Sequence, residues 1–425
     1  MRRYFLALVA ILLAGAAFAQ QPKSIDVWGI IQNSTDQTLP NMVKEFNAAH
    51  SDMRAVLTQY QNDPYKQKLV VAMGADQGPD VFFGWGGGTL KEYVDAGKVY
   101  DLTSALNADP AWKARYPASV LAGATFGGKV YAVPINNVQP VFFYYNKQLF
   151  DSHGVSVPKT WDELLAAVKT FKDAGVAPIA LGGASKWPDL MWEEYLVDRV
   201  GGPGAFNAAA NGEAGAWSSE AFVKANTMIQ DLVKAGGFQN GFESTTQDSN
   251  APAALLYTGR AAMELMGSWE YGTIANAAPD FVKNDHLGVF AFPAVQAGSG
   301  DPKDIAGNLA NYYSITAFAK NKDVAVQFLK DEALSDSQVI AQLKVGQVPA
   351  AAGISDLIDQ YGSAPAFQHF VNGLVQDAPN FQLSWDQALP PALGQELLRN
   401  LDLLFTQQIT PQQFSQNMDK AAAAP

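Results

Sequence analysis

Cysteine is absent from the chain, so no disulfide can form and the fold must be held together by packing. Basic residues are also scarce, with 29 lysines and arginines against 41 acidic residues and a formal net charge of −12. A surface of that charge repels nucleic acids and anionic membranes, and no basic run offsets it. We therefore expect neither nucleic acid nor a membrane surface as a partner.

Catalytic and metal-binding motifs are missing as well. The four histidines are scattered, without the H-E-x-x-H spacing or any other metal-ligand spacing, and no G-x-S-x-G motif occurs. Ser156 to Lys159 spells S-x-x-K, but Pro158 and the following helix start place this serine before a helix, so the match is a chance one. Glu193 and Glu194 are adjacent on a predicted helix and point apart, which makes a poor acid–base pair. No catalytic residue, metal site or cofactor is expected.

Long apolar runs are confined to the first 19 residues. Two arginines precede an apolar run over residues 5–18, which ends in the small-residue pattern Ala17-Phe18-Ala19. This arrangement is typical of a bacterial secretory signal peptide and predicts cleavage after Ala19. The run is shorter than the roughly 20 apolar residues that span a bilayer, and Gln20 is not the cysteine that a lipid anchor needs. We expect a periplasmic protein without a membrane anchor.

What remains after cleavage predicts a two-domain α/β protein. Removing 19 of 425 residues leaves 406, with 27 basic and 41 acidic side chains and a net charge of −14. A chain of that length is too long to fold around a single hydrophobic core. Strand patterns at 25–28, 55–60 and 81–83 alternate with helical spacing at 39–46 and 65–73, an order that favours a mainly parallel sheet. Similar patterns recur later without a long linker, which predicts lobes joined by several chain crossings.

Four of the nine tryptophans directly follow predicted strands or lie in polar loops: Trp85, Trp187, Trp269 and Trp385. In the stretch GRAAMELMGSW, a strand-like run at 261–266 enters a Gly-Ser turn and then reaches Trp269. Strand ends of α/β sheets open onto the ligand crevice. An indole offers a flat apolar face and one N–H donor, which suits a sugar ring. The alternative, that each of these tryptophans fills a gap in the core, stays open.

Uncharged amide side chains gather in loops next to the predicted strands. They are Asn136, Asn137 and Gln139 in PINNVQP, Asn33 after the first strand, and Asn308 and Asn311 in GNLANYY. Amides donate and accept hydrogen bonds without introducing charge, which matches the hydroxyls of a sugar. Asp63 in the Asn-Asp-Pro turn is a further candidate, with helix capping as its alternative role. An ordinary asparagine-rich turn is the alternative for the PINNVQP loop.

Four stretches carry a resemblance to a known family. They are GPDVFF before Trp85, GKVYAVPINNVQPVFFYYNKQLFDSHGVSVPKTWDELLAAVKTF, LLYTGRAAMELMGSW, and YYSITAFAKNKDVAVQFLKDEALSDSQ with the later VGQVPA. Together they span nearly the whole mature chain, and the second and third are specific. The chain resembles the family 1 extracellular solute-binding proteins of bacterial sugar ABC importers, the maltose-binding-protein-like group.

The resemblance implies an α/β, two-lobed periplasmic-binding-protein fold with hinge strands and a ligand cleft between the lobes. Residues 23–136 plus 305–350 would form one lobe, and residues 137–304 plus 351–425 the other. Trp269 matches the ring-stacking tryptophan of the family, Trp85 lies beside its cleft aromatic, and Trp385 resembles a late cleft tryptophan. The loop from Asn136 to Gln139 falls at the hinge. Maltodextrin-binding relatives have charged residues after the first strand, where this chain has Gln32 and Asn33.

The function expected from the resemblance is capture of a neutral mono- or oligosaccharide by lobe closure. A monomer of this kind would deliver its ligand to the permease subunits of an ABC transporter and would perform no chemistry. A secreted carbohydrate-active enzyme is one alternative, and it would need two carboxylates roughly 5 to 10 Å apart across the cleft. The same fold binding a non-sugar solute, such as a metal chelate or a phosphorylated alcohol, is another.

Overall fold

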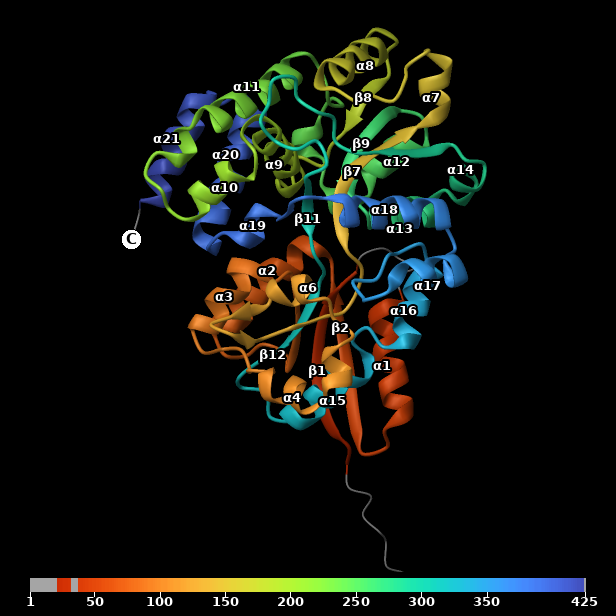
Figure 1. The fold of residues 1–425 in the computed structure, drawn as a ribbon, viewed down its shortest axis with the longest axis vertical. Coiled ribbons are helices and arrows are strands. Elements are labelled where there is room, and N and C mark those ends of the chain that lie inside the picture. The colour runs from red at the N-terminus through yellow and green to blue at the C-terminus, as the bar shows by residue number, and fades with distance from the viewer. Residues whose placement is uncertain (1–20, 32–36, 424–425) are drawn as a thin grey trace, which may run out of the picture.

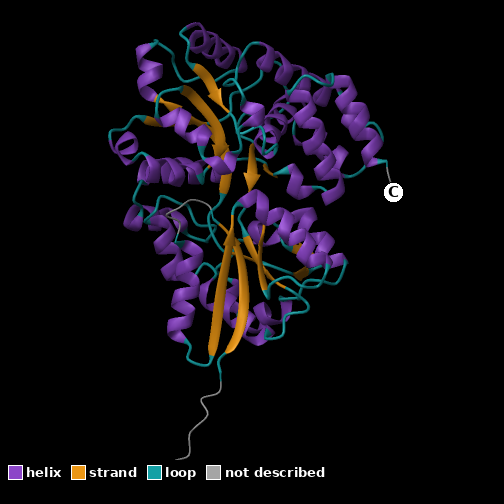
Figure 2. Ribbon diagram, turned by 180° about the vertical axis from the view of Figure 1, so that it is seen from behind, coloured by secondary structure: helices purple, strands orange, loops and turns teal. Residues whose placement is uncertain are grey.

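Two β-sheets, each flanked by helices, form two lobes stacked end to end in the computed structural model (Figure 1). The structure describes residues 21–31 and 37–423. The expected signal peptide and Asn33 lie outside the described residues. Figure 2 shows helices covering the outer faces of the strands in both lobes, as α/β layers require. The expected two-lobed α/β fold is confirmed.

Lobe 1, the lower lobe of Figure 1, is built on a five-stranded sheet of order β2-β1-β3-β12-β6. Its strands are β1 (Lys23–Ile30), β2 (Met53–Tyr60), β3 (Val81–Gly84), β6 (Val133–Pro134) and β12 (Tyr312–Ile315). Strands β1, β2 and β3 are parallel, as the βαβαβ order predicts, whereas β12 runs antiparallel to β3 and β6. Residues 129–134 form two short strands, β5 (Lys129–Val130) and β6, and β5 pairs with β4 (Thr125–Phe126).

The helices of lobe 1 come from two separate parts of the chain. The first part supplies α1 (Thr38–Ala49), α2 (Asn62–Gly74), α3 (Gly87–Asp95), α4 (Thr103–Ala108), α5 (Pro110–Lys113) and α6 (Ala118–Ala122). The second supplies α15 (Lys322–Glu332) and α16 (Asp336–Leu343), both of which pack against α1. Helix α1 buries Leu39, Met42 and Phe46, the apolar face that the helical spacing predicts.

Lobe 2 is built on a mixed sheet of order β13-β11-β7-β9-β8, with β10 paired to β7. Its strands are β7 (Gln139–Asn146), β8 (Ala177–Ala180), β9 (Ala261–Gly267), β10 (Leu287–Phe290), β11 (Ile305–Asn308) and β13 (Phe381–Leu383). Strand β9 is buried along its whole length, which explains why all of its residues except Glu264 are apolar or glycine. It lies between β7 and the edge strand β8.

Helices cover lobe 2 on all sides of its sheet (Figures 1 and 2). They are α7 (Lys147–Ser152), α8 (Trp161–Asp173), α9 (Trp187–Gly201), α10 (Pro203–Ala210), α11 (Glu220–Lys234), α12 (Ala251–Tyr257), α13 (Glu270–Ala277), α14 (Pro279–Lys283), α18 (Pro365–Asp377), α19 (Trp385–Ala388), α20 (Pro391–Phe405) and α21 (Pro411–Ala422). A capping box begins α8: the Thr160 hydroxyl accepts from the Glu163 backbone amide, and the Glu163 carboxylate accepts from the Thr160 backbone amide. Helix α17 (Ile354–Tyr361) lies between α16 and α18.

Three chain crossings join the lobes. The first runs from β6 to β7, the second from β11 to β12, and the third follows α16. The first and third crossings are tied together, because the Val138 amide donates to the Val348 carbonyl and the Ala350 amide donates to the Asn136 carbonyl. The expected boundary at residue 305 is wrong: β11 pairs with β7 and β13 of lobe 2, so the second crossing lies at residues 309–311.

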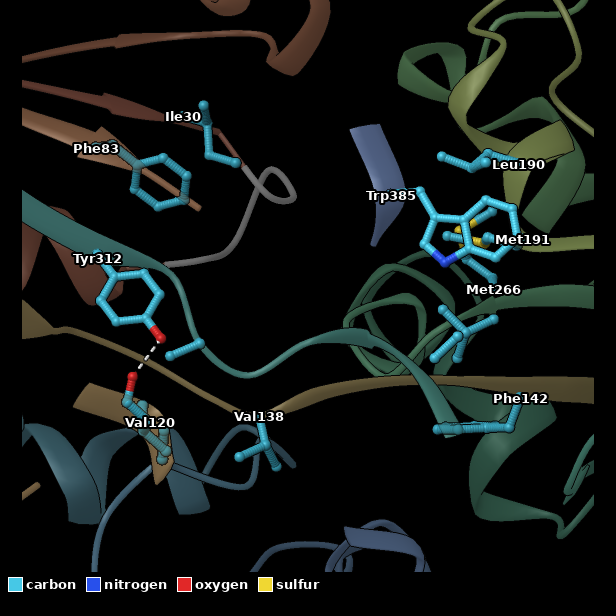
Figure 3. Packing of buried hydrophobic residues seen from close by; sticks show 14 of the residues in the cluster. Ile30, Phe83, Val120, Val138, Phe142, Leu190, Met191, Met266, Tyr312 and Trp385 are labelled. Carbon is cyan, nitrogen blue, oxygen red and sulfur yellow. Dashed lines mark hydrogen bonds between the residues drawn. The ribbon is translucent and has the colours of Figure 1, made fainter. Parts of the chain in front are cut away.

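Each lobe has its own group of buried side chains on either side of the crossings. Figure 3 shows Ile30, Phe83 and Tyr312 on the lobe 1 side, and Leu190, Met191 and Trp385 on the lobe 2 side, with Val138 on the crossing between them. Within residues 21–31 and 37–423, no helix is both long and apolar enough to cross a bilayer.

Candidate ligand-binding site

A pocket with a cavity of about 200 Å³ lies between the lobes and in front of the crossings. Lobe 1 contributes Ile30, Ile31, Gln61, Asn62, Lys66 and Trp85 to its lining. The crossings and lobe 2 contribute Gln139, Val141, Trp187, Met191, Gln247, Asp248, Asn250, Trp269, Glu270, Thr273, Gly307, Asn308, Asn311, Ser384, Asp386 and Gln387. The site is therefore shared between the two lobes, as a binding site that responds to closure has to be.

Trp85 is the aromatic side chain that lobe 1 presents to the pocket. It follows β3 directly, and its half-buried ring packs edge-on against Phe83 and Tyr65, with centroids 5.2 and 6.2 Å away. The Tyr65 hydroxyl in turn donates to the Phe83 carbonyl at 2.6 Å, which fixes α2 against β3. Lys66 Nζ lies 5.0 Å from the Trp85 ring centroid, within the range of a cation–π contact. Trp85 is thus held by its own lobe before any ligand arrives.

Trp187 and Trp269 face the same pocket from lobe 2. Their ring centroids lie 6.1 Å apart at an interplanar angle of 54°, and both rings are half-buried. Gly267, the last residue of β9, makes room for Trp269, because a Cβ at that position would overlap the six-membered ring of the indole. The structure therefore accounts for the order of residues in GRAAMELMGSW: the buried strand ends, the glycine clears space, and the indole turns into the pocket.

Trp385 is a correction to the sequence-based expectation. Its side chain is 1% exposed and stacks on Phe206 of α10, with ring centroids 4.3 Å apart and nearly parallel planes. Trp217 and Phe222 complete an aromatic cluster around it. Its neighbours Ser384 and Asp386 line the pocket, but the indole points into the core of lobe 2. Trp385 fills a gap in the interior, which was the alternative role for all four tryptophans.

The amides divide into a group at the pocket and a group at the hinge. Gln139, Asn308 and Asn311 line the pocket. Gln139 Nε2 donates to Asn311 Oδ1 at 2.8 Å, and Asn308 Nδ2 contacts Gln139 Oε1 at 3.5 Å. Asn308 Oδ1 is buried and has no protein partner. A buried acceptor of this kind calls for a donor, and a ligand hydroxyl would supply one.

Asn136 and Asn137 do not line the pocket, which corrects the expectation that they contact ligand. Asn136 Nδ2 donates to Asn311 Oδ1 at 2.8 Å, while the Asn311 amide donates to Asn136 Oδ1 at 3.0 Å. Asn137 Nδ2 contacts Ser268 Oγ at 3.4 Å. These bonds satisfy buried backbone and side-chain groups where the strands cross. Asn136 therefore fastens the first crossing to the second, and Asn137 ties the first crossing to the turn after β9.

The sequence did not predict the charged residues that line the pocket. Lys66 and Asp386 come from opposite lobes, and their Nζ and Oδ2 atoms lie 3.5 Å apart. Asp248 and Glu270 add carboxylates from lobe 2, and burial raises the pKa of both. Glu270 and Asp386 directly follow Trp269 and Trp385, two of the candidate tryptophans. A single charged residue in a loop nevertheless has no sequence pattern that distinguishes it from an ordinary surface charge.

Beneath Trp269, Glu264 and Glu270 form a buried acidic pair. Burial raises the pKa of both carboxyls, and the nearby charge of Glu270 raises the pKa of Glu264 further because two negative charges repel in a medium of low dielectric constant. Gln247 Nε2 donates to Glu264 Oε1 at 3.2 Å and connects this pair to the pocket. A carboxyl that keeps its proton donates as well as accepts hydrogen bonds. Protonated Glu270 can therefore donate a hydrogen bond to a hydroxyl group or accept one from it.

The lobes touch beside the pocket, where the glycine run after Trp85 meets α19. A Cβ at Gly88 would lie 2.7 Å from the Ala388 carbonyl oxygen and closer still to that of Leu389. A Cβ at Gly87 would lie 2.8 Å from a methyl carbon of Leu383 and would also collide with the Gln387 carbonyl oxygen. The backbone of this glycine run, which carries no side chains, therefore lets the opposite lobe approach closely.

Asp63 lies in the first turn of α2, at the opposite end of the lobe contact from α3, and does not line the pocket. Its carboxylate accepts from Ser185 Oγ at 2.7 Å and from Trp187 Nε1 at 3.3 Å, both in lobe 2. No backbone N–H of the described α2 donates to this carboxylate, so the helix-capping alternative does not describe its contacts. Asp63 bridges the lobes.

Buried carboxyls make stability depend on pH. Burial raises the pKa of Glu193 and of Glu194 from 4.5 to about 8. The folded state therefore holds protons that the unfolded chain has released, and stability is expected to fall as pH rises from about 5 to about 8, by roughly 1.4 kcal/mol per pH unit for each of the two carboxyls. Urea unfolding at pH 5, 6.5 and 8 measures this slope.

Glu193→Gln is the matched control for that measurement. It removes one of these titrations without touching the pocket lining, so the stability of the variant should depend less steeply on pH than that of the wild type. A wild-type stability that stayed flat or rose between pH 5 and pH 8 would contradict the assignment of protonated interior carboxyls.

Three comparisons place the chain among known proteins. A family model for bacterial extracellular solute-binding proteins matches residues 32–337. An uncharacterized ABC transporter extracellular-binding protein of Pyrococcus horikoshii is 31% identical over 231 residues, which is 54% of this chain and 50% of that protein. A solved structure from a study of xylan utilization by Caldanaerobius polysaccharolyticus is 30% identical, with a TM-score of 0.86 and coverage of 93% of this chain and 99% of that one. A solved chitin oligosaccharide binding protein is 26% identical, with a TM-score of 0.81 and coverage of 93% and 98%.

The chain spans half the length of the P. horikoshii relative but nearly the whole of both solved structures. The family model covers well over half of the chain, from the end of β1 to α16. The resemblance noted in the sequence is confirmed, and the chain belongs to the bacterial extracellular solute-binding protein family.

Proposed function

We propose that the protein binds a neutral sugar between its lobes and delivers it to the permease subunits of an ABC importer. One observation carries the proposal: Trp85 from lobe 1 and Trp187 and Trp269 from lobe 2 line a single pocket. Apolar ring faces on both sides suit the C–H faces of a pyranose, and the amides of Gln139 and Asn308 suit its hydroxyls.

The similar structures support this substrate class. One comes from a study of xylan utilization, and the other is a chitin oligosaccharide binding protein. Xylan and chitin are both polymers of pyranose units. The cavity of about 200 Å³ lies below the roughly 300–1,000 Å³ of typical ligand pockets, which favours one or two sugar rings over a long chain.

Binding by closure requires no covalent chemistry. A ligand that contacts both lobes binds the closed state more tightly than the open state and so shifts the population toward it. The closed form then presents both lobes together to the permease. We infer a monomer in the periplasm, released after signal-peptide cleavage behind Ala19, that leaves its ligand chemically unchanged.

A thermal-shift screen over neutral sugars tests the proposal. Xylobiose, chitobiose, cellobiose, maltose and their monosaccharides are the natural panel, with glucuronic acid and glucose 6-phosphate as charged counterparts. A ligand at 100 times its dissociation constant adds about 2.7 kcal/mol to stability, so at least one neutral sugar should raise the melting temperature clearly. A response to the charged members alone would reject a neutral ligand, and cleavage of a disaccharide during incubation would indicate an enzyme.

A further inference from the structure

Asp63 connects lobe 1 to three residues that shape the pocket from the lobe 2 side. Its carboxylate accepts from the Trp187 indole N–H and from the Ser185 hydroxyl. The Ser185 hydroxyl oxygen itself accepts from the backbone N–H of Gln247 at 3.1 Å. The Asp63 amide donates to Asp248 Oδ2 at 3.1 Å. Trp187, Gln247 and Asp248 all line the pocket, whereas Asp63 and Ser185 do not.

The local structure of both lobes prepares this contact. Asp63 stands at the start of α2, and Asn62 Nδ2 donates to Asp63 Oδ1 at 2.9 Å, which orients the carboxylate toward lobe 2. On the opposite side, Lys186 has a φ of 64°, a left-handed conformation that reverses the chain between Ser185 and Trp187 just before α9 begins. Ser185 and Trp187 can therefore point their donors toward the same acceptor.

We propose that Asp63 is a positioning residue that couples lobe closure to the assembly of the ligand-binding surface. In the closed state its carboxylate fixes the direction of the Trp187 N–H and with it the plane of the ring beside Trp269. In the open state these donors face water, and the Trp187 ring is free to rotate. This inference rests on the proposed function, because it assigns Asp63 a role in building that site.

The bonds involved are of the strong kind. A carboxylate that accepts two hydrogen bonds makes charge-assisted bonds, which contribute more than neutral ones. Bonds of this type stabilise the closed state relative to the open state, and they also fix the orientation of the Trp187 ring. If the fraction of closed molecules falls, the affinity measured on the whole population falls by the same factor. We expect Asp63→Ala to weaken sugar binding about tenfold, mainly through faster dissociation.

A double-mutant cycle separates positioning from general stability. The probe is whichever sugar of the neutral panel raises the wild-type melting temperature most, measured by calorimetry and stopped-flow tryptophan fluorescence. Trp187→Phe keeps a ring but removes the N–H donor, so Asp63→Ala should cost clearly less affinity in that background than in the wild type. Asp63→Asn keeps one acceptor oxygen and should fall between the wild type and Asp63→Ala. Equal losses in both backgrounds would overturn the proposal.

A second measurement needs no sugar. The chain contains no cysteine, so Ala48→Cys on α1 and Ala166→Cys on α8, both exposed, take spin labels without background. We expect Asp63→Ala to shift the distance distribution between the lobes toward longer values. Asp323→Ala, which removes a lobe 1 carboxylate paired with Lys23 at the surface, should leave it unchanged.

The two experiments fail in different ways. If no sugar binds but Asp63→Ala still opens the lobes, the proposed ligand is wrong and the role of Asp63 in closure stands. If sugar binds and Asp63→Ala changes neither its affinity nor the distances relative to Asp323→Ala, the role of Asp63 is rejected. The role of Asp63 is also rejected if the two spin labels of the wild-type protein, with or without sugar, never come closer together than those of Asp63→Ala.

Discussion

Replacing Gly88 by alanine is expected to prevent full closure of the lobes and to weaken ligand binding by about 5- to 150-fold. The new Cβ would lie 2.7 Å from the Ala388 carbonyl oxygen and nearer still to that of Leu389. Both obstacles are backbone atoms, which cannot rotate away as a side chain can. Overpacking of this kind costs roughly 1–3 kcal/mol, and here the cost falls on the closed state because the atoms belong to different lobes.

Gly88 isolates this effect better than its neighbours do. Gly86 and Gly87 have φ values of 78° and 62°, so alanine at either position would strain lobe 1 itself. Gly88 has no such φ, and the fold of lobe 1 should tolerate its substitution. Titration calorimetry measures the affinity, and small-angle X-ray scattering with and without sugar measures closure.

Gly74→Ala is the matched control. Gly74 is the last residue of α2, its φ is also compatible with alanine, and nothing lies within 4 Å of the position that a Cβ would occupy. It should bind sugar like the wild type and close like the wild type. If Gly88→Ala behaves in the same way, the contact between α3 and α19 is not part of the ligand-bound state.

The glycine run also shows how far the sequence predicts this site. Three consecutive glycines behind a strand and a tryptophan do indicate that something approaches the backbone closely, and it does. At Gly87 and Gly88 the neighbour is the chain at Gln387 to Leu389, some 300 residues away along the sequence, whereas at Gly86 it is Gly123 and Tyr312 of lobe 1. A local pattern records that space is needed but carries no information about which distant segment fills it.

The fold follows more directly from the sequence than the site does. Strands β1, β2 and β3 and the helices between them come from patterns contained in about ten residues each, and such patterns determine the parallel order of lobe 1. The family resemblance placed residues 305–350 in lobe 1, whereas Ile305–Asn308 forms β11 and pairs with strands of lobe 2. Its partner β13 lies more than 70 residues further along the chain.

The same limit applies to the polar residues. Asn136 and Gln139 are three residues apart in one loop, yet one fastens the crossings and the other faces the pocket. Both side chains donate to Asn311 Oδ1 at 2.8 Å, so their shared partner does not distinguish the residue at the pocket from the residue at the crossings. The composition of the loop predicts that its amide side chains form hydrogen bonds. It does not predict their common partner, Asn311, which lies in a distant segment of the chain.

Substituting Trp269 by alanine is expected to weaken sugar binding by at least about 2 kcal/mol, roughly 30-fold, with little change in the melting temperature of the ligand-free protein. Large half-buried aromatic side chains at the centre of a binding site typically carry contributions of that size. Trp269 packs on Gly267 and Trp187 at the pocket rather than inside the lobe. Titration calorimetry and differential scanning fluorimetry measure the two quantities separately.

Trp385→Ala makes the same chemical change at a tryptophan that the sequence alone does not distinguish from Trp269. Because Trp385 is enclosed by Phe206, Trp217 and Phe222, its removal leaves a cavity, and we expect a loss of about 3–5 kcal/mol of stability. Opposite phenotypes follow from a difference in surroundings alone: one indole meets solvent and ligand, the other meets three aromatic rings. A large loss of ligand-free stability in Trp269→Ala would show that its ring belongs to the interior of lobe 2, and the pocket would then lose the platform on which sugar recognition depends.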